Sequence, residues 1–289
     1  MPFPAKAVGA EPPPVHSDLT ARAVLAFAAG IGAAEPAFLD DAREGLLALP
    51  FQCVSLEWPC LLGLRAALGG LTAEEAVRGV HVAQDSLFHR PMRPGDLLTT
   101  SGRLVSARAV TAGVLTVVRL DTRCRQSGEV VVTSWSSSIY RDVALDGEAA
   151  ILANPPGLPA GASDPLPASA EGVRLPIARE AAHVYSECAD IWNPIHTERR
   201  VALATGLPDI ILHGTATWAL AGLTLLRRYV DRDGTRLRRF RGRFTGMVIP
   251  GETVTVRHAP GAQGMVRFEV LNGADAPAIS EGAALFAAP

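Results

Sequence analysis

A short segment in the second half of the sequence, DIWNPIHTERR at residues 190–200, gathers residue types that can move protons. It holds an acid, Asp190, and an imidazole, His196, which can exchange protons, and an amide, Asn193, which can hydrogen-bond; all three are candidate catalytic residues. Pro194 keeps the residue before it extended and is tolerated in the first turn of a helix, where its missing N–H has no partner to lose. We expect a helix over IHTERRVALA with His196 held at its start as a general acid or base. A helix cap around a structural histidine is the alternative.

A second segment, LPDIILHGTATWALA, places a glycine at the start of an apolar helix. The N-terminus of a helix offers unpaired N–H groups and the positive end of the helix dipole, and glycine lets a ligand oxygen approach the backbone closely. Gly214 and its neighbours His213 and Thr215 are therefore candidates for an oxyanion site that binds a thioester carbonyl. Trp192 is interpreted as a buried wall of the same pocket. The alternative is that Gly214 only relieves packing between the helix and a sheet.

The elements that must position these residues come in two similar halves. FHRPMRPGDLLTT, from Phe88, and FTGMVIPGETVTV, from Phe244, share a Pro-Gly-acid turn that leads into an alternating strand. In each half such strands continue as a predicted antiparallel meander, with β-branched runs between glycine and polar breaks. The repeated turn and meander indicate a duplicated unit.

A helix precedes the meander in each half. HGTATWALAGLTLLRRYV is apolar on nearly every face, so it must be buried, and its own sheet is the natural partner. WPCLLGLRAALGG is the shorter counterpart, with Gly69-Gly70 as its C-terminal signal. The predicted class is α+β, a double hotdog in which an antiparallel sheet wraps a central helix twice. Residues 1–149 form the first, non-catalytic unit, 150–172 a linker rich in Pro, Gly and Ala, and 173–289 the second.

Composition excludes several classes of function. The chain has 289 residues, 48% of them hydrophobic and 19% charged, with a net charge of −2 and no basic run, so nucleic acid and anionic membranes are poor partners. Its four cysteines form no C-x-x-C pair, and no stretch of about 18 apolar residues spans a membrane. We expect reduced thiols, a cytoplasmic location, and no metal or cofactor, since no metal-ligand spacing or phosphate loop occurs.

Together these segments resemble the MaoC-like, or hydratase 2, family of (R)-specific enoyl-thioester hydratases and dehydratases. That signature reads Gly-Asp-x-Asn-Pro-Leu/Ile-His, with a later His-Gly at the start of the central helix, and Asn193-Pro194-Ile195-His196 and His213-Gly214 match it. VHVAQ and FHRPMRPGD resemble the His-Gly-Glu-Gln and Tyr-His-Arg-Pro-Leu-Arg-Pro-Gly-Asp segments of the non-catalytic first hotdog in two-domain members. The resemblance implies an acyl-CoA or acyl-carrier-protein substrate and a monomer that is a pseudo-dimer, or a homodimer.

The acid departs from the signature. The family aspartate lies two residues before the asparagine, where this chain has Ile191, and Asp190 lies three before. Since the resemblance implies that the aspartate and the histidine together hold the reacting water, we expect a one-residue bulge to bring Asp190 beside His196. Glu187 as a substitute, or no acid at all, are the alternatives. A hotdog thioesterase and a thioester-binding subunit without turnover are the alternative functions.

Overall fold

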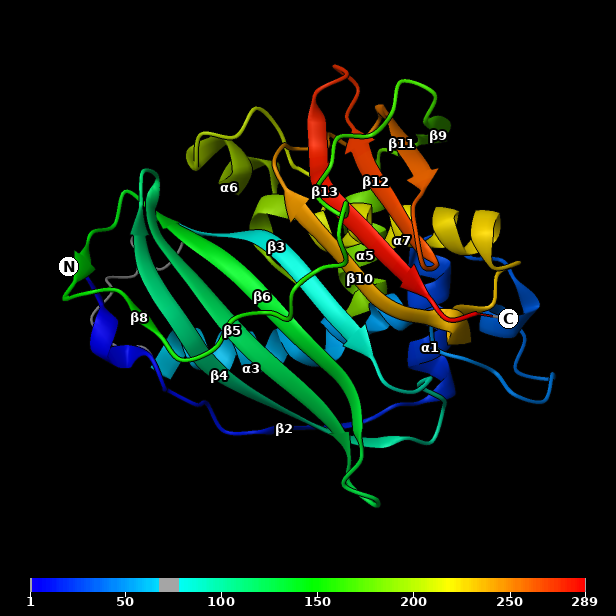
Figure 1. Cartoon of the computed structure of the whole chain (residues 1–289), viewed down its shortest axis with the longest axis horizontal. Helices are drawn as coiled ribbons and strands as arrows, with labels where there is room; N and C mark the ends of the chain where they lie inside the picture. The colour runs from blue at the N-terminus through cyan, green and yellow to red at the C-terminus, as the bar shows by residue number, and fades with distance from the viewer. Residues whose placement is uncertain (1, 68–77, 289) are drawn as a thin grey trace. The chain divides into compact units, whose positions relative to one another are not determined.

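The computed structural model describes residues 2–67 and 78–288, and these divide into two compact units (Figure 1). The first unit contains the described residues of 1–18, 56–89 and 97–158, and the second contains 19–55, 90–96 and 159–289. The units therefore interleave along the sequence, because two segments of the first half pack with the second. The division of the chain into two hotdog units by a linker at residues 150–172 stays a prediction. No helix in the described ranges is long and apolar enough to cross a membrane.

The first unit is an antiparallel sheet with one central helix. Its strands pair in the order β2 (Val15–Asp18), β4 (Leu97–Val110), β5 (Gly113–Cys124), β6 (Val130–Arg141) and β3 (Gly79–Phe88), with β8 (Ala150–Ile151) on β4. A short parallel pair, β1 (Phe3–Pro4) with β7 (Leu145–Asp146), and the turn η1 (Ala5–Ala7) complete it. The helix α3 (Cys53–Ala67) packs Cys60 and Leu64 into the core formed by β4 and β5. The expected stop at Gly69-Gly70 lies outside the described residues.

The second unit repeats this arrangement. Its strands pair in the order β9 (Glu171–Pro176), β11 (Thr253–Pro260), β12 (Met265–Leu271), β13 (Pro277–Phe286) and β10 (Leu237–Phe244). Its helices and turns are α1 (Ala21–Gly30), α2 (Pro36–Leu39), η2 (Pro50–Gln52), α5 (Ala181–Ala189), η3 (Pro194–His196), α6 (Arg199–Ala204), α7 (Gly214–Tyr229) and η4 (Gly234–Arg236). Trp218 of α7 is fully buried and its ring lies 4.7 Å from that of Phe240 on β10, so α7 is the predicted buried helix.

The repeated Pro-Gly-acid turn has the same hydrogen bonds in both halves. Gly95 and Gly251 have φ angles of 91° and 101°, in the left-handed region that glycine adopts at low cost. The Asp96 carboxylate accepts from the N–H of Arg93 at 2.9 Å, and the Glu252 carboxylate accepts from the N–H of Ile249 at 3.1 Å. The turns precede β4 and β11, which hold equivalent places in the two strand orders. The duplication predicted from the sequence is confirmed in the backbone.

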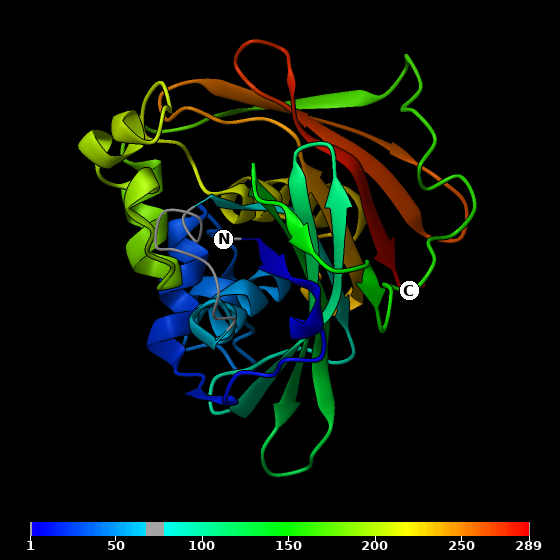
Figure 2. The same ribbon diagram turned by 90° about the vertical axis from the view of Figure 1, so that its left-hand side faces the viewer.

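Helix α5, which leads to the Asn-Pro-Ile-His segment, is fixed against α1. Figures 1 and 2 both place the two helices side by side. The rings of Phe27 and Tyr185 lie 6.0 Å apart, and a Cβ added at Gly30 would lie 2.6 Å from the Cβ of Cys188. Because only glycine allows that approach, α1 packs closely against the last turns of α5. The C-terminal end of α5 is thereby anchored immediately before the candidate site.

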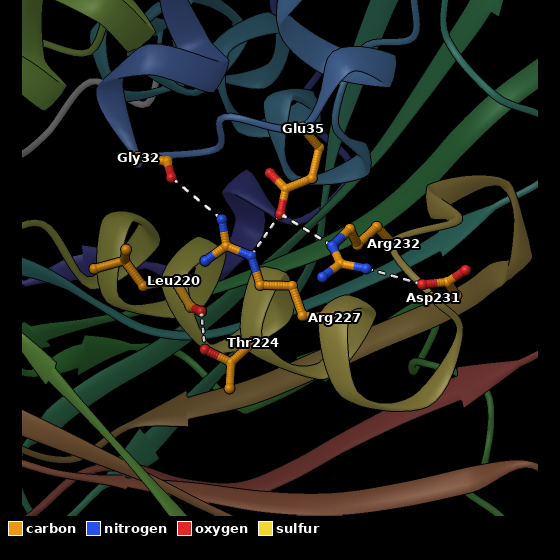
Figure 3. Close-up of polar contacts among 7 residues, drawn as sticks. All are labelled: Gly32, Glu35, Leu220, Thr224, Arg227, Asp231 and Arg232. Carbon is orange, nitrogen blue, oxygen red and sulfur yellow. Dashed lines mark hydrogen bonds and ion pairs between the residues drawn. The ribbon is translucent and has the colours of Figure 1, made fainter.

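A buried carboxylate ties the C-terminal end of α7 to the segment before α2 (Figure 3). Oε1 of Glu35 accepts from Nε of Arg227 at 2.5 Å and lies 4.0 Å from Nε of Arg232, and Glu35 is 8% exposed. Burial alone raises the pKa of Glu35, but the hydrogen bond and charge of Arg227, with the charge of Arg232, more than offset it and hold the pKa below its ordinary value. Arg227 also donates to the carbonyl of Gly32 at 3.3 Å. These contacts connect the C-terminal end of α7 to the segment before α2 within the second unit.

Replacing Glu35 with glutamine should lower the free energy of unfolding by about 1.5 to 3 kcal/mol, the usual contribution of a hydrogen bond to a charged group. The change removes the carboxylate that Arg227 contacts and keeps the side-chain volume. Asp231→Asn is the matched control, since Asp231 pairs with Arg232 but is 94% exposed, and exposed pairs contribute about 0 to 1 kcal/mol. Denaturant unfolding checks both variants, and equal losses would contradict the role of Glu35.

Candidate functional site

His196 lies at the end of a rigid turn rather than inside a long helix. Pro194 is the first residue of η3, the Asn193 side chain accepts from the N–H of Ile195 at 3.4 Å, and the N–H of His196 bonds to the Asn193 carbonyl at 3.0 Å. The single helix expected over IHTERRVALA is wrong, because Thr197 leaves the helical conformation and α6 begins at Arg199. Asn193, expected to be catalytic, uses its side-chain oxygen as the cap of this turn.

The hydrogen bond on one ring nitrogen of His196 sets its tautomer. Nδ1 lies 2.8 Å from the carbonyl oxygen of Ile211. A carbonyl oxygen only accepts, so Nδ1 carries the hydrogen and Nε2 carries the lone pair. Burial lowers the pKa of His196 to about 4, although the bond to Ile211 acts in the opposite direction. His196 is therefore a neutral imidazole near pH 7, with Nε2 able to accept a proton.

His213 lies directly against His196. The two rings are stacked, with centroids 3.7 Å apart and an angle of 25° between their planes. His213 is 3% exposed, and its Nε2 lies 3.2 Å from both the Ile191 carbonyl oxygen and the Ser186 hydroxyl oxygen. Burial first, and then the neighbouring His196, lower the pKa of His213 to about 2. The His213 side chain is thus enclosed by protein groups, and its expected role in substrate binding stays a prediction.

The N-terminus of α7 begins where the sequence predicts, at Gly214. The preceding residue, His213, provides no side-chain cap for the first N–H groups of α7. A Cβ at Gly214 would lie 3.1 Å from Cδ1 of Phe244, so glycine also serves the packing between α7 and β10. Thr215, in the first turn, accepts from the Tyr185 hydroxyl at 3.2 Å and is half-buried. Both interpretations of Gly214 thus keep a structural basis.

The expected acid and the expected aromatic wall point to solvent. Asp190 ends α5 in a left-handed conformation, with φ 53° and ψ 41°, and its exposed carboxylate makes no hydrogen bond or ion pair within the described part of the chain. The next residue, Ile191, is 5% exposed, and its carbonyl accepts from His213. Trp192 is 57% exposed, so the expectation that it is buried is wrong. Because the backbone at this position directs the Ile191 side chain into the interior, the side chains on either side of it, Asp190 and Trp192, face the solvent.

The second half of the chain matches a known domain. Residues 166–273 match the family model described as a MaoC like domain, and residues 6–134 match the FAS1-like dehydratase domain region. A curated enoyl-CoA hydratase of Mycobacterium tuberculosis is 29% identical over 267 residues, which cover 86% of each chain. Residues 166–273 therefore form a MaoC-like domain. The family resemblance seen in the sequence is confirmed.

Solved MaoC-like structures share the fold. A MaoC-like dehydratase from Phytophthora capsici superposes with a TM-score of 0.81 at 20% identity, covering 99% of this chain and 98% of its own. A Mycobacterium tuberculosis protein described as a double hotdog has a TM-score of 0.62 at 15% identity, covering 96% of this chain and 95% of its own. The predicted double hotdog is therefore confirmed for this MaoC-like chain.

The MaoC-like signature explains the geometry before Asn193. Aligned without a gap, Asp190 takes the place of the signature glycine and Ile191 that of the aspartate. The left-handed backbone at Asp190 is the conformation that glycine adopts readily and that aspartate tolerates better than most residues. The backbone therefore follows the gapless alignment at Asp190, and it offers no sign of the extra residue that a bulge needs. The buried residue at the acid position of this MaoC-like site is apolar.

The structure thus brings together some predicted residues and adds others. His196, His213 and the start of α7 lie side by side, whereas the side chains of Asp190 and Trp192 are exposed and, among the described residues, make no hydrogen bond or ring contact with them. Tyr185 and Ser186 were missed by sequence reasoning, although they sit at consecutive positions of α5 and contact Thr215 and His213. Their polar character on the buried side of a helix was the available signal. Within residues 2–67 and 78–288 no group of three or more His, Cys, Asp or Glu could hold a metal ion.

Proposed function

We propose that this chain is a hydro-lyase that adds or removes water across the 2,3 bond of an enoyl or 3-hydroxyacyl thioester, with His196 as its acid–base group. The observation that carries the proposal is the neutral, half-buried His196, which is stacked on the residue that precedes α7 and whose Nε2 has no hydrogen-bond partner among the described residues. We take the thioester to be a coenzyme A ester, as the relative matched over 86% of the chain is an enoyl-CoA hydratase. An acyl-carrier-protein thioester is the alternative.

The chemistry needs one group that both takes and returns a proton. In hydration, Nε2 of His196 accepts a proton from water as the water oxygen bonds to carbon 3. The electron pair of the double bond moves toward the thioester oxygen and gives an enolate. Nε2 then returns the proton to carbon 2, and the imidazole is again neutral. Dehydration follows the same steps in reverse.

The N-terminus of α7 would stabilise the enolate oxygen. Its first N–H groups, at Gly214 and Thr215, have no side-chain cap and lie at the positive end of a 16-residue helix. Fixed donors directed at a charge that develops during the reaction are among the largest contributions to catalysis. His213, the residue before Gly214, stacks on His196, so the acid–base group and the oxyanion donors are adjacent.

Ile191 favours one alternative. At the position of the signature acid, an apolar side chain leaves His196 to hold the water without a carboxylate beside it. A protein that binds the thioester without turnover would have the same site. A thioesterase, which attacks the carbonyl carbon rather than carbon 3, would release free thiol. These alternatives are distinguishable with one substrate.

We expect the purified protein to hydrate trans-2-enoyl-CoA with a turnover number within the usual enzyme range of about 1 to 1000 per second. Loss of the enoyl absorbance measures hydration, a thiol reagent measures release of coenzyme A, and the same acyl group on a carrier protein tests the alternative carrier. Tight binding without loss of absorbance would support the binding subunit. Thiol release without hydration would support the thioesterase.

Replacing Asp190 with asparagine should leave hydration within about twofold of the parent protein. The carboxylate is exposed and unbonded, and asparagine tolerates the left-handed conformation of this position. Glu187→Gln tests the alternative in which Glu187 substitutes for that acid, because Glu187 is also exposed and lies on the same helix. Steady-state rates of both variants check the expectation. A loss of a hundredfold in Asp190→Asn would restore the interpretation in which Asp190 holds the water.

A further inference from the structure

His213 is enclosed by groups that also shape the candidate site. Its ring lies between the rings of His196, at 3.7 Å, and Tyr185, at 5.0 Å. Its Nε2 reaches the Ile191 carbonyl and the Ser186 hydroxyl, each at 3.2 Å. All these contacts join the N-terminus of α7 to α5 and to the turn that carries His196. His213 therefore contacts both the proposed acid–base group and the residue at the signature acid position.

The hydrogen bonds of His213 fix which nitrogen carries its proton. The Ile191 carbonyl only accepts, so Nε2 of His213 is the protonated nitrogen and donates to it. Nδ1 is then unprotonated, and it is buried without a hydrogen-bond partner among the described residues. An imidazole with one nitrogen engaged and the other enclosed has no group free for a substrate. The other contact of His213 with the candidate site is the stacking of its ring on the ring of His196.

We infer that His213 is a positioning residue, which fixes the ring plane of His196 by stacking and fixes the backbone of Ile191 by hydrogen bonding. The inference rests on the proposed function of His196. The bond from Nδ1 to the Ile211 carbonyl holds one edge of the His196 ring but leaves the ring freedom to tilt. The stacked face of His213 removes this freedom, so Nε2 points in one direction. With Ile191 at the acid position, no carboxylate from that residue can orient the imidazole or its water.

Two substitutions separate the two contacts. His213→Phe keeps an aromatic ring but loses the donor to Ile191, and His213→Gln keeps an N–H donor but loses the ring. We expect each to lower kcat by about 10- to 100-fold with KM within about twofold, because a misplacement of about 1 Å can cost about a hundredfold in rate. Thr224→Val is the matched control. Thr224 is a buried polar residue of the same helix, and its bond to the Leu220 carbonyl, 2.9 Å, is local (Figure 3).

A spectroscopic measurement reports on His196 directly. Nitrogen NMR of the histidine rings should show His196 protonated at Nδ1 in the parent protein, and its ring-nitrogen signals should shift or broaden in the folded His213 variants as the ring loses its single orientation. Unchanged kcat and an unchanged His196 spectrum in both variants would overturn the inference. A raised KM with unchanged kcat would also overturn it and return His213 to substrate binding.

A third variant covers the case in which the His213 variants do not fold. Ser186→Ala removes one partner of the His213 Nε2 and leaves the ring in place. A fall in kcat of about threefold or more at unchanged KM supports the inference, and parental kcat overturns it. The proposed function is judged separately. A parent protein that hydrates no enoyl thioester contradicts that function, whereas an active parent with fully active His213 variants contradicts only the positioning role.

Discussion

His196→Ala is expected to lower the rate of enoyl-thioester hydration by at least about a hundredfold, the usual scale for losing a positioned acid or base. The variant lacks the Nε2 that takes the proton from water and returns it to carbon 2. The fold should persist, because the turn is held by Pro194 and by the Asn193 cap, which the substitution leaves in place. Steady-state kinetics with circular dichroism as a check on folding measure both expectations.

The matched control is His183→Ala. His183 lies on α5, is exposed, and makes a hydrogen bond of 2.9 Å from Nε2 to the Thr197 carbonyl. The substitution removes an imidazole that is close in sequence to the site but is not part of the stacked pair of His196 and His213. We expect its rate to stay within about twofold of the parent. Full activity of His196→Ala on a substrate that the parent hydrates would remove His196 from the mechanism.

The pH dependence follows from the same residue. Burial lowers the pKa of His196 to about 4, and the neutral form is the proposed base. Activity should therefore be complete above pH 5 or so and fall as the pH decreases through about 4. The pKa of His196 in the folded state lies below the ordinary value of 6.5, so the unfolded state binds the proton first as the pH falls. The stability that this residue contributes above pH 6.5 is therefore lost as the pH decreases toward about 4. Short assays at each pH, with the fold monitored, separate the two effects.

Local signals in the sequence predicted most of the fold. The two Pro-Gly-acid turns and the cap at Asn193-Pro194 depend on neighbouring residues, so their backbone could be inferred without knowledge of the tertiary structure. The burial of α7 followed from its apolar faces. The packing of residues 19–55 with the second unit had no such local signal, because it depends on contacts such as that between Gly30 and Cys188.

The site was predicted only in part, for a related reason. His196 and Gly214 could be identified by motif and by helix position. The stacking of His213 on His196 joins residues distant in sequence, and no pattern in the sequence specifies it. Asp190 was proposed from the chemistry of its side chain, which the structure leaves exposed, and its catalytic role stays a prediction. The left-handed φ at that residue is a requirement on conformation, which a glycine in the signature already indicated.

Gly222→Ala is expected to destabilise the second unit more than any other single methyl group added to α7. A Cβ at Gly222 would lie 2.1 Å from Cζ of Phe51. Phe51 is fully buried, with its ring 5.5 Å from that of Trp218 and 5.2 Å from that of Phe240, so it has little room to move. Alanine in a helix normally gains about 1 kcal/mol over glycine. Overpacking at this distance should exceed that gain and lower the free energy of unfolding by about 2 to 3 kcal/mol net.

Gly63→Ala on α3 is the control, because among the described residues a Cβ there would meet only Pro12, at 3.4 Å, and the change should be neutral or stabilising. A second substitution tests the cause of the loss. Phe51→Leu alone should destabilise by leaving a cavity, yet in the Gly222→Ala background it should cost less, because the shorter side chain clears the new methyl group. Thermal unfolding of the two single variants and the double variant measures this coupling. Additive losses would show that the ring of Phe51 is not what requires glycine at position 222, and that α7 can shift to accept a side chain.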